Sequence, residues 1–127
     1  MKSLLLIAFF VLPLAAVGQT HDHGSGTSLL RECNAVSSPV TTDSVNNLEA
    51  GLCIGLVRGV MATMQMWQVE RYTMKEQMDM HGCIPHQVED SGAIKVVLKY
   101  LNDHPDRLHL DDTILIHTAL LDEYPCK

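Results

Sequence analysis

Basic residues, aromatic residues and long hydrophobic runs are all scarce in this chain of 127 residues. The chain has nine Lys and Arg and fifteen Asp and Glu. Its net charge of −6 means that nucleic-acid phosphates and anionic lipid repel it. Two Phe, three Tyr and one Trp are too few for a surface that stacks bases. With 46% apolar and 19% charged residues, the composition is that of a folded protein, and the length suits one domain. Together these features exclude a nucleic-acid-binding protein and a disordered tail.

The longest uninterrupted apolar run lies at the start of the chain. Met1 and Lys2 precede it, residues 4–12 form it, and Pro13 and small residues follow. This order is typical of a secretory signal peptide, and the run is shorter than the ~20 residues that a membrane span needs. We predict a signal peptide over residues 1–18 with cleavage after Gly18, or alternatively after Ala16. The mature chain then loses Lys2, carries a net charge of −7, has no membrane segment and is exported.

The helical spacing of apolar residues predicts the secondary structure of the chain after the signal peptide. Residues 19–27 are polar and rich in glycine and predict a flexible leader, so we assign the folded domain to residues 28–127. Alternating strand patterns are lacking, and the expected fold is an all-α four-helix domain with one long helix and a C-terminal helical hairpin. Pairs of capping residues predict where the first three helices begin: Thr27 or Ser28, Asp43 or Ser44, and Asp90 or Ser91.

The ends and faces of the helices follow from the same pattern. We expect the first helix to end at Cys33, the long helix to end near Met80, and the fourth to begin near Leu110. The long helix is predicted to bury Val45, Leu48, Leu52, Leu56, Val60 and Met64. The third helix is predicted to bury Ala93, Ile94, Val97, Leu98, Tyr100 and Leu101 before stopping at residues 102–105. The fourth is predicted to turn inward Ile114, Leu115, Thr118 and Leu121.

Glycine recurs every four residues in the long helix, at Gly51, Gly55 and Gly59. Each glycine costs about 1 kcal/mol relative to alanine inside a helix. A row of them leaves a smooth groove on one face, which predicts close packing of a neighbouring helix. Gly82, after His81, is expected to end the long helix with a positive φ.

Four cysteines lie beyond residue 18, without a Cys-x-x-Cys or His-x-x-x-His pair. An even count in a small exported chain indicates two disulfides rather than a zinc site. A straight long helix would separate Cys53 from Cys83 by up to about 45 Å, whereas disulfide Cα atoms lie within about 7 Å. We therefore expect Cys33–Cys53 and Cys83–Cys126. A kink at the glycines would instead permit Cys53–Cys83 with Cys33–Cys126.

Metal binding is a weaker possibility. If Gln19 is the first mature residue, then Gln19-Thr20-His21 offers an amine, two amides and an imidazole to Cu(II) or Ni(II), with His23 as an extra ligand. Methionine at helical spacing is more often core or adaptable surface, so we predict no metal and no cofactor. The alternative functions are a copper-binding protein and a periplasmic chaperone with a Met-rich face. Both would use Met61, Met64, Met66, Met74, Met78 and Met80.

Catalytic constellations are lacking. There is no Ser-His-Asp order, no phosphate-binding loop and no paired-carboxylate motif. We interpret His104, before Pro105, as a helix-end residue and His117 as a half-buried core residue, and His109 has no partner set that suggests catalysis. The prediction is a non-enzyme without catalytic residues.

Several landmarks occur in a fixed order. They are Cys-Ile-Gly-Leu-Val-Arg-Gly over 53–59, Cys-Ile-Pro over 83–85, Val-Val-Leu-Lys-Tyr-Leu over 96–101, His104-Pro105 and Tyr124-Pro125-Cys126. This ordered set, over about residues 48–126, resembles the Rap/Tai family of small immunity proteins of bacterial type VI secretion. Two positions depart from the family pattern: Leu56 replaces a frequent aromatic residue, and Glu89 stands where a threonine cap is frequent.

The resemblance implies an exported all-helical domain, often a homodimer, with intrachain disulfides. Such proteins bind and block toxic peptidoglycan amidases delivered into the periplasm by sister cells, so the expected partner is a cognate amidase toxin. The contact residues are not assigned by these landmarks. An acidic inhibitor is suited to a cationic enzyme that works on an anionic polymer. Acidic residues at loops and helix ends are candidates for the rim, although helix capping explains several equally well: Glu89, Asp90, Asp103, Asp106, Asp111, Asp112, Asp122 and Glu123.

Overall fold

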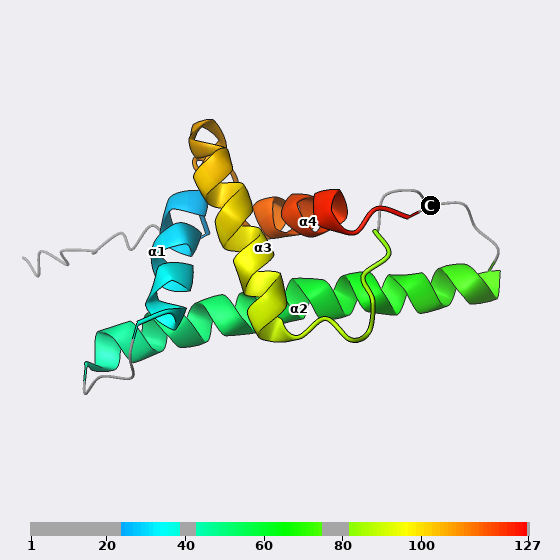
Figure 1. The fold of residues 1–127 in the computed structure, drawn as a ribbon, viewed down its shortest axis with the longest axis horizontal. Helices are drawn as coiled ribbons and strands as arrows, with labels where there is room; N and C mark the ends of the chain where they lie inside the picture. The colour runs from blue at the N-terminus through cyan, green and yellow to red at the C-terminus, as the bar shows by residue number, and fades with distance from the viewer. Residues whose placement is uncertain (1–23, 39–42, 75–81, 127) are drawn as a thin grey trace, which may run out of the picture.

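The computed structural model describes residues 24–38, 43–74 and 82–126, and over these ranges the chain is helical with no strand (Figure 1). The predicted all-α architecture with one long helix is confirmed. The elements are α1 (Gly26–Val36), α2 (Ser44–Met74), α3 (Asp90–Asp103), a short 3-10 helix η1 (Pro105–Arg107) and α4 (Asp112–Glu123).

The long helix α2 is the base on which the other helices pack. Its 31 residues span about 46 Å at 1.5 Å per residue. In Figure 1, α1 lies against the first part of α2, α3 crosses near its middle, and α4 lies beyond α3. The shared core includes fully buried side chains from every α-helix: Leu29 from α1, Val57 from α2, Val97 and Leu101 from α3, and Leu115, Ile116 and Leu120 from α4.

The start of α1 differs from the prediction. Ser25 is the N-cap: its hydroxyl accepts from the Ser28 N–H at 3.3 Å, and the Ser28 hydroxyl accepts from the Ser25 N–H at 3.2 Å. The predicted caps, Thr27 and Ser28, are therefore wrong. The helix begins inside the stretch expected to be a leader, of which residues 19–23 lie outside the described part. It also runs past Cys33, its predicted end, to Val36.

Backbone hydrogen bonds explain the earlier start. The Gly26 N–H donates to the Leu110 carbonyl at 2.9 Å, and the Thr27 N–H donates to the Leu108 carbonyl at 3.0 Å. These are N–H groups that the first turn of a helix leaves without intrahelical partners. The connection between α3 and α4 supplies the missing acceptors, a long-range contact that local sequence does not reveal.

The buried face of α2 matches the prediction only in part, because Met64 is buried as predicted and Leu56 and Val60 are partly buried. Val45, Leu48 and Leu52 are 61%, 63% and 40% exposed, whereas the face that turns into the core carries Cys53, Val57, Met61 and Met64. Successive residues of a helix differ by about 100°, so a reading based on Leu52 instead of Cys53 selects a different face. The Cys33–Cys53 disulfide decides the matter, because it holds the Cys53 face against α1.

The helix ends are predicted with mixed success. Asp43 caps α2 as expected, accepting from the Val45 N–H at 3.0 Å, and the predicted extension from Met74 to about Met80 falls outside the described residues. The N-cap of α3 is Glu89, so Asp90 and Ser91 as caps are wrong by one or two positions. Glu89, which stands where a threonine cap is frequent in the family, is thus the N-cap of α3. The predicted end of α3 is confirmed, with His104 as its C-cap.

In α4 the helix starts at Asp112, two residues after its expected start near Leu110, with Asp111 as its N-cap. Ile114, predicted to face inward, is 57% exposed, and Thr118 and Leu121 are only partly buried. Leu115 is buried as predicted, and the other core residues of α4 are Ile116, Ala119 and Leu120. For α3 the predicted face is confirmed, with Leu98 partly buried and the other five residues buried.

Candidate functional site

The face of α2 that the core leaves uncovered is apolar. Val45, Leu48 and Leu52 begin it, and Met66 and Trp67 follow at 54% and 44% exposure. At 100° per residue these side chains lie on one side of the helix, together with the half-buried Leu56 and Val60. We call this set of seven residues the α2 apolar face. It is long and mostly apolar, and the one charged residue described in the same sector, Glu49, is paired with Arg31 at 2.8 Å.

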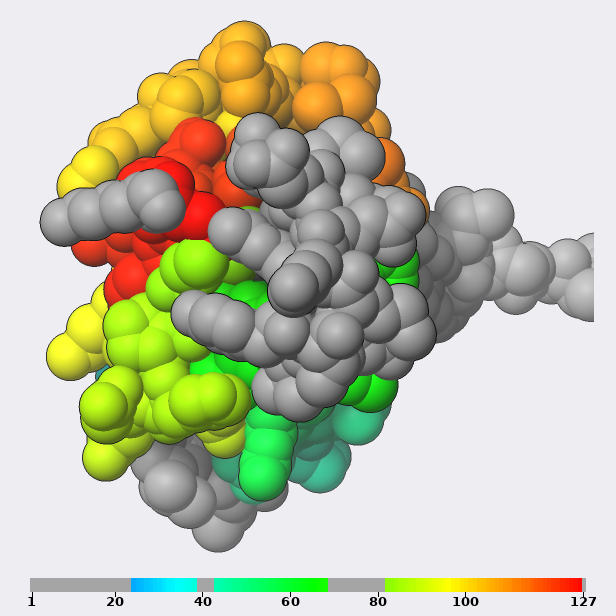
Figure 2. Space-filling model, turned by 90° about the vertical axis from the view of Figure 1, so that its right-hand side faces the viewer, coloured from blue at the N-terminus to red at the C-terminus, as the bar shows by residue number. Residues whose placement is uncertain are grey.

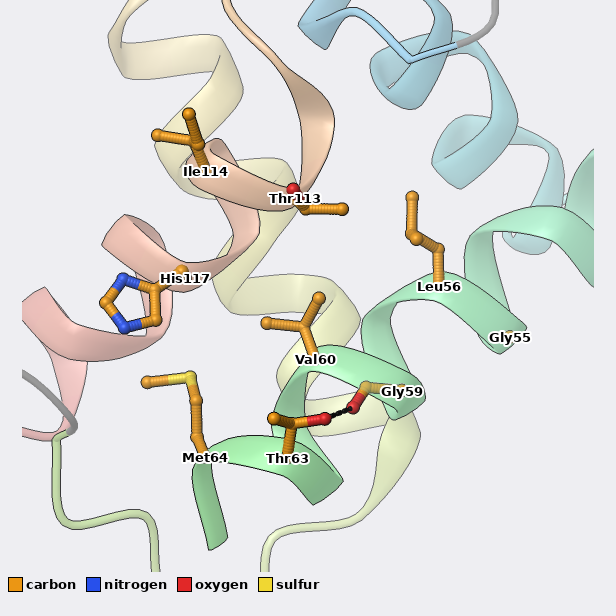
Figure 3. A pocket seen from close by; sticks show the side chains of 9 residues that line it. All are labelled: Gly55, Leu56, Gly59, Val60, Thr63, Met64, Thr113, Ile114 and His117. Atoms are coloured by element: carbon orange, nitrogen blue, oxygen red, sulfur yellow. Dashed lines mark hydrogen bonds between the residues drawn. The ribbon is translucent and has the colours of Figure 1, made fainter. Parts of the chain in front are cut away.

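A groove continues this face toward α4. It has a volume of about 510 Å³ and is lined by Gly55, Leu56, Gly59, Val60, Thr63 and Met64 of α2 and by Thr113, Ile114 and His117 of α4. Figure 3 shows Leu56, Val60 and Met64 rising from α2 opposite the α4 side chains. The structure thus brings together three predicted core residues that are not fully buried, Leu56, Val60 and Ile114, with the predicted half-buried His117.

Two glycines open one wall of the groove. A Cβ atom added at Gly55 or Gly59 would meet nothing within 4 Å, and the same is true at Gly51. The predicted neighbouring helix is therefore not present against these glycines within the described part of the chain. A wall without side chains lets the backbone of an incoming partner approach closely.

The threonine hydroxyls of the groove are already engaged. Thr63 donates to the Gly59 carbonyl at 2.9 Å, the dashed contact in Figure 3, and Thr113 hydrogen-bonds to the Asp111 carboxylate. Because the Thr63 hydroxyl is bonded within α2 and the Thr113 hydroxyl is bonded to the N-cap of α4, the groove is mainly an apolar recess. It is suited to apolar side chains rather than to a charged substrate.

Negative charge stands at one end of the groove. The Thr113 hydroxyl and the Ile114 N–H donate to Asp111, and these hydrogen bonds lower the pKa of its carboxyl group. Asp111 therefore remains ionised at neutral pH beside two groove residues. Its neighbour Asp112 behaves in the opposite way, because partial burial raises the pKa of its carboxyl group.

The other acidic candidates are dispersed over helix ends. Asp103 receives a hydrogen bond from Lys99 at 2.8 Å, which raises the pKa of Lys99 and lowers that of Asp103. Asp90 lies 3.8 Å from Arg58. A second, smaller hollow of about 160 Å³ gathers Asp103 with Asp122 and Glu123. Exposed pairs of this kind contribute little to stability.

The histidines take the places expected of them. The His104 ring stacks on Tyr100 with centroids 4.2 Å apart, and its Nδ1 lies 2.9 Å from the Tyr100 carbonyl oxygen, so it is a helix-end residue. His117 is half-buried beside the groove, and His109 is exposed. Arg107 completes this region by donating to the Tyr100 hydroxyl at 2.6 Å.

Metal-ligand groups do not gather in the described part of the chain, where no three His, Cys, Asp or Glu residues are placed to hold an ion. The amino-terminal ligands Gln19, Thr20, His21 and His23 lie outside that part. Met61 and Met64 are core residues at 5% and 3% exposure, which leaves them unavailable as a Cu(I) surface site. Met66 is exposed, and nothing is described of the side chains of Met74, Met78 and Met80.

Both predicted disulfides are confirmed. Cys33–Cys53 has its Cα atoms 5.0 Å apart and Cys83–Cys126 has them 4.9 Å apart. The alternative pairing that a kinked α2 would permit is wrong. Gly82 precedes the second bridge with a φ of 62°, the positive value expected of it, and its added Cβ would approach the Tyr124 carbonyl oxygen at 3.2 Å.

These features define a class of protein: a small all-α domain that is braced by two disulfides and exposes an apolar groove. None of the described helices is long and apolar enough to cross a membrane. The model of one family, the Rap1a immunity proteins, matches residues 25–126, so this chain belongs to that family. No curated protein and no solved structure gives a significant match.

Proposed function

We propose that this chain is a periplasmic immunity protein that binds and blocks a peptidoglycan amidase effector of type VI secretion. Family membership is the observation that carries the proposal, because the match spans all four α-helices. Two disulfides agree with an oxidising compartment, and residues 1–18 are the proposed export signal. The mechanism is occlusion by a rigid surface and needs no bond-breaking step.

The groove between α2 and α4 is the proposed contact for the toxin. Its apolar lining and the exposed Ile114 supply area that becomes buried on binding, and Asp111 supplies negative charge at one end. An enzyme that works on an anionic cell-wall polymer is suited to carry cationic residues around its cleft, which an acidic inhibitor complements. A second copy of this chain is a poorer occupant, because both copies carry a net charge of −6 and would place Asp111 near the same interface.

The proposed toxin contact is tested by comparing substitutions at two exposed isoleucines, one inside the groove and one outside it. Ile114 lines the groove, and Ile54 is exposed on α2 but does not line it. The purified mature protein is titrated against an amidase encoded beside its gene, with cell-wall hydrolysis as the readout. Ile114→Asp is expected to weaken inhibition about 30-fold or more, as a hot-spot loss of 2 kcal/mol or more would. Ile54→Asp is expected to change it by less than about twofold.

Equal effects of the two substitutions would refute the groove as the contact. The amidase proposal itself fails if the tagged protein captures no peptidoglycan hydrolase from the periplasm of a toxin-expressing strain. The homodimer implied by the resemblance stays a prediction. Sedimentation equilibrium tests this prediction. If the groove is the interface between two copies, the Ile114→Asp variant will be a monomer.

A further inference from the structure

The two disulfides differ sharply in their exposure to solvent. Cys33 and Cys53 are both at 0% exposure, between α1 and α2 in the centre of the core. Cys83 is exposed and Cys126 is only half-buried. Both bridges are closed, and only the second includes an exposed cysteine residue that a molecule approaching from outside can reach. This difference is independent of any toxin, because it follows from the fold alone.

The exposed bridge fastens two surface segments to each other. In Figure 2 the yellow-green segment that begins at residue 82 lies against the red end of the chain. The Cys83 N–H donates to the Tyr124 carbonyl at 2.7 Å, beside the bridge. Gln68 of α2 donates to the Gly82 carbonyl at 2.9 Å, which holds the segment to the long helix independently of sulfur. The Cys83–Cys126 bridge, which we call the clasp, thus attaches the residues after α4 to the segment before α3. The chain between its cysteines contains α3 and α4.

We propose that Cys83–Cys126 is a site of thiol–disulfide exchange for a dithiol oxidoreductase of the Cys-x-x-Cys class, and that Cys33–Cys53 is a permanent brace. Exchange requires a thiolate to reach a sulfur of the bridge, and an exposed bridge permits this in the folded state. The buried bridge permits it only after α1 separates from α2. The folded protein therefore has one reversible crosslink and one fixed crosslink.

The exchange balances in two steps. A thiolate of the oxidoreductase attacks Sγ of Cys83, which belongs to the more exposed of the two residues, and the Cys83–Cys126 bond breaks with Cys126 leaving as a thiolate. The second thiol of the oxidoreductase then loses its proton and attacks its own sulfur in the mixed disulfide, and Cys83 leaves as a thiolate. Two electrons pass from the dithiol to the bridge, the oxidoreductase ends as a disulfide, and the proton lost by its second thiol is available to the released thiolates.

Opening the clasp has a local structural effect. The residues after Glu123 keep the backbone hydrogen bond between Cys83 and Tyr124 but lose their covalent attachment. The core residues contributed by α1 and α2 stay crosslinked by Cys33–Cys53. Reduction therefore releases the end of the chain without unfolding the four helices.

The experiment follows the appearance of thiols in the oxidised mature protein. A reduced thioredoxin-type Cys-x-x-Cys protein is added, samples are quenched with iodoacetamide, and alkylated peptides are mapped over time by mass spectrometry. Alkylation of Cys83 and Cys126 is expected at least about tenfold faster than that of Cys33 and Cys53, with an unchanged helical circular dichroism spectrum, because exchange follows access. Equal rates for the four cysteines, or faster alkylation of the buried pair, would overturn the proposal.

A trapping variant tests the site of attack. An oxidoreductase whose second cysteine is replaced by serine is expected to remain attached to Cys83 in a mixed disulfide. Attachment to Cys33 or Cys53 would overturn the assignment of the site, and attachment to Cys126 would overturn the assignment of the attacked sulfur. The Cys83→Ser/Cys126→Ser variant is the control, because it keeps the brace and is expected to yield no trapped complex in the absence of denaturant.

Discussion

Replacing Gly59 with alanine is expected to stabilise the protein while weakening its action on the toxin. Gly59 lies in the interior of α2, and a Cβ added there would meet no atom within 4 Å. The substitution therefore removes the helix penalty of glycine, about 1 kcal/mol, without introducing a clash. For a domain of about 100 residues, 1 kcal/mol raises the melting temperature by roughly 4–8 °C. The same methyl group projects from the wall of the groove and takes up space in which a partner would pack.

The effect on binding is estimated from overpacking. A methyl group inserted into a well-packed contact costs about 1–3 kcal/mol, and 1.4 kcal/mol corresponds to tenfold in affinity. Gly59→Ala and Gly55→Ala are therefore expected to weaken amidase inhibition by about tenfold each. Gly51→Ala is the matched control, because Gly51 is equally open and equally helical but does not line the groove. Calorimetry measures the stability and the hydrolysis titration measures the inhibition.

Two results would refute this reasoning. A lower melting temperature for Gly59→Ala would mean that the glycine wall is packed against something in the free protein. A higher melting temperature with unchanged inhibition would mean that the groove is not the toxin contact. Raised stability for all three variants, with weakened inhibition for Gly55→Ala and Gly59→Ala alone, is the expected pattern.

Three further predictions concern stability. Gly26→Ala should lower the free energy of unfolding by about 1–3 kcal/mol in urea titrations, because its Cβ would lie 2.9 Å from the Leu108 Cα atom; a neutral effect would contradict the close approach. Asp111→Ala should destabilise the protein at pH 7. Since folding lowers the pKa of Asp111, its contribution is present above the unfolded pKa and is lost as pH falls through the folded pKa, so a pH-independent difference in melting temperature would refute it. Cys83→Ser/Cys126→Ser should lose about 4 kcal/mol, the loop-entropy value for cysteines 43 residues apart; a loss below about 1 kcal/mol in the same titrations would show that loop entropy contributes little.

Local sequence was sufficient for the elements and for the sulfur framework. The pairing of Cys33 with Cys53 follows from helix length, because a straight α2 keeps Cys53 away from Cys83. The inward face of α3 is also predictable, since its apolar side chains recur every three or four residues and lie on one side of the helix. The positive φ of Gly82 follows from its position beyond the long helix, where the chain must turn.

The face that α2 buries was not predictable from periodicity. Apolar residues occupy two faces of this helix, and the more regular one, from Val45 to Val60, is mostly uncovered. Combining the helical period with the disulfide at Cys53 would have selected Val57 and Met61 as core residues together with Met64, which was predicted. The same limit applies to Ile114, because α4 is also apolar on more than one side and only its packing against α3 and α2 decides which residues turn inward.

The capping errors have a different cause. Ser25 lies in the stretch predicted to be a flexible leader, and Glu89 is followed by Asp90 and Ser91, whose side chains are more typical of N-caps. At Ser25 the decision comes from residues about eighty positions away, whose carbonyls accept the first N–H groups of α1. Partners this remote leave no trace in a local pattern. The groove was missed for a related reason, since its two walls come from helices distant in sequence.

The hydrogen bonds that tie the start of α1 to the approach to α4 also fix where the chain can be shortened. The Asp112 N–H donates to the Gly24 carbonyl at 3.1 Å, and Ser25 pairs with Asp111 in an isolated bridge. A truncated protein that begins at residue 28 would lose this two-stranded attachment together with the cap of α1. An affinity tag intended to leave the domain intact therefore belongs ahead of Gly24, where its junction lies close to the end of the groove that carries Asp111.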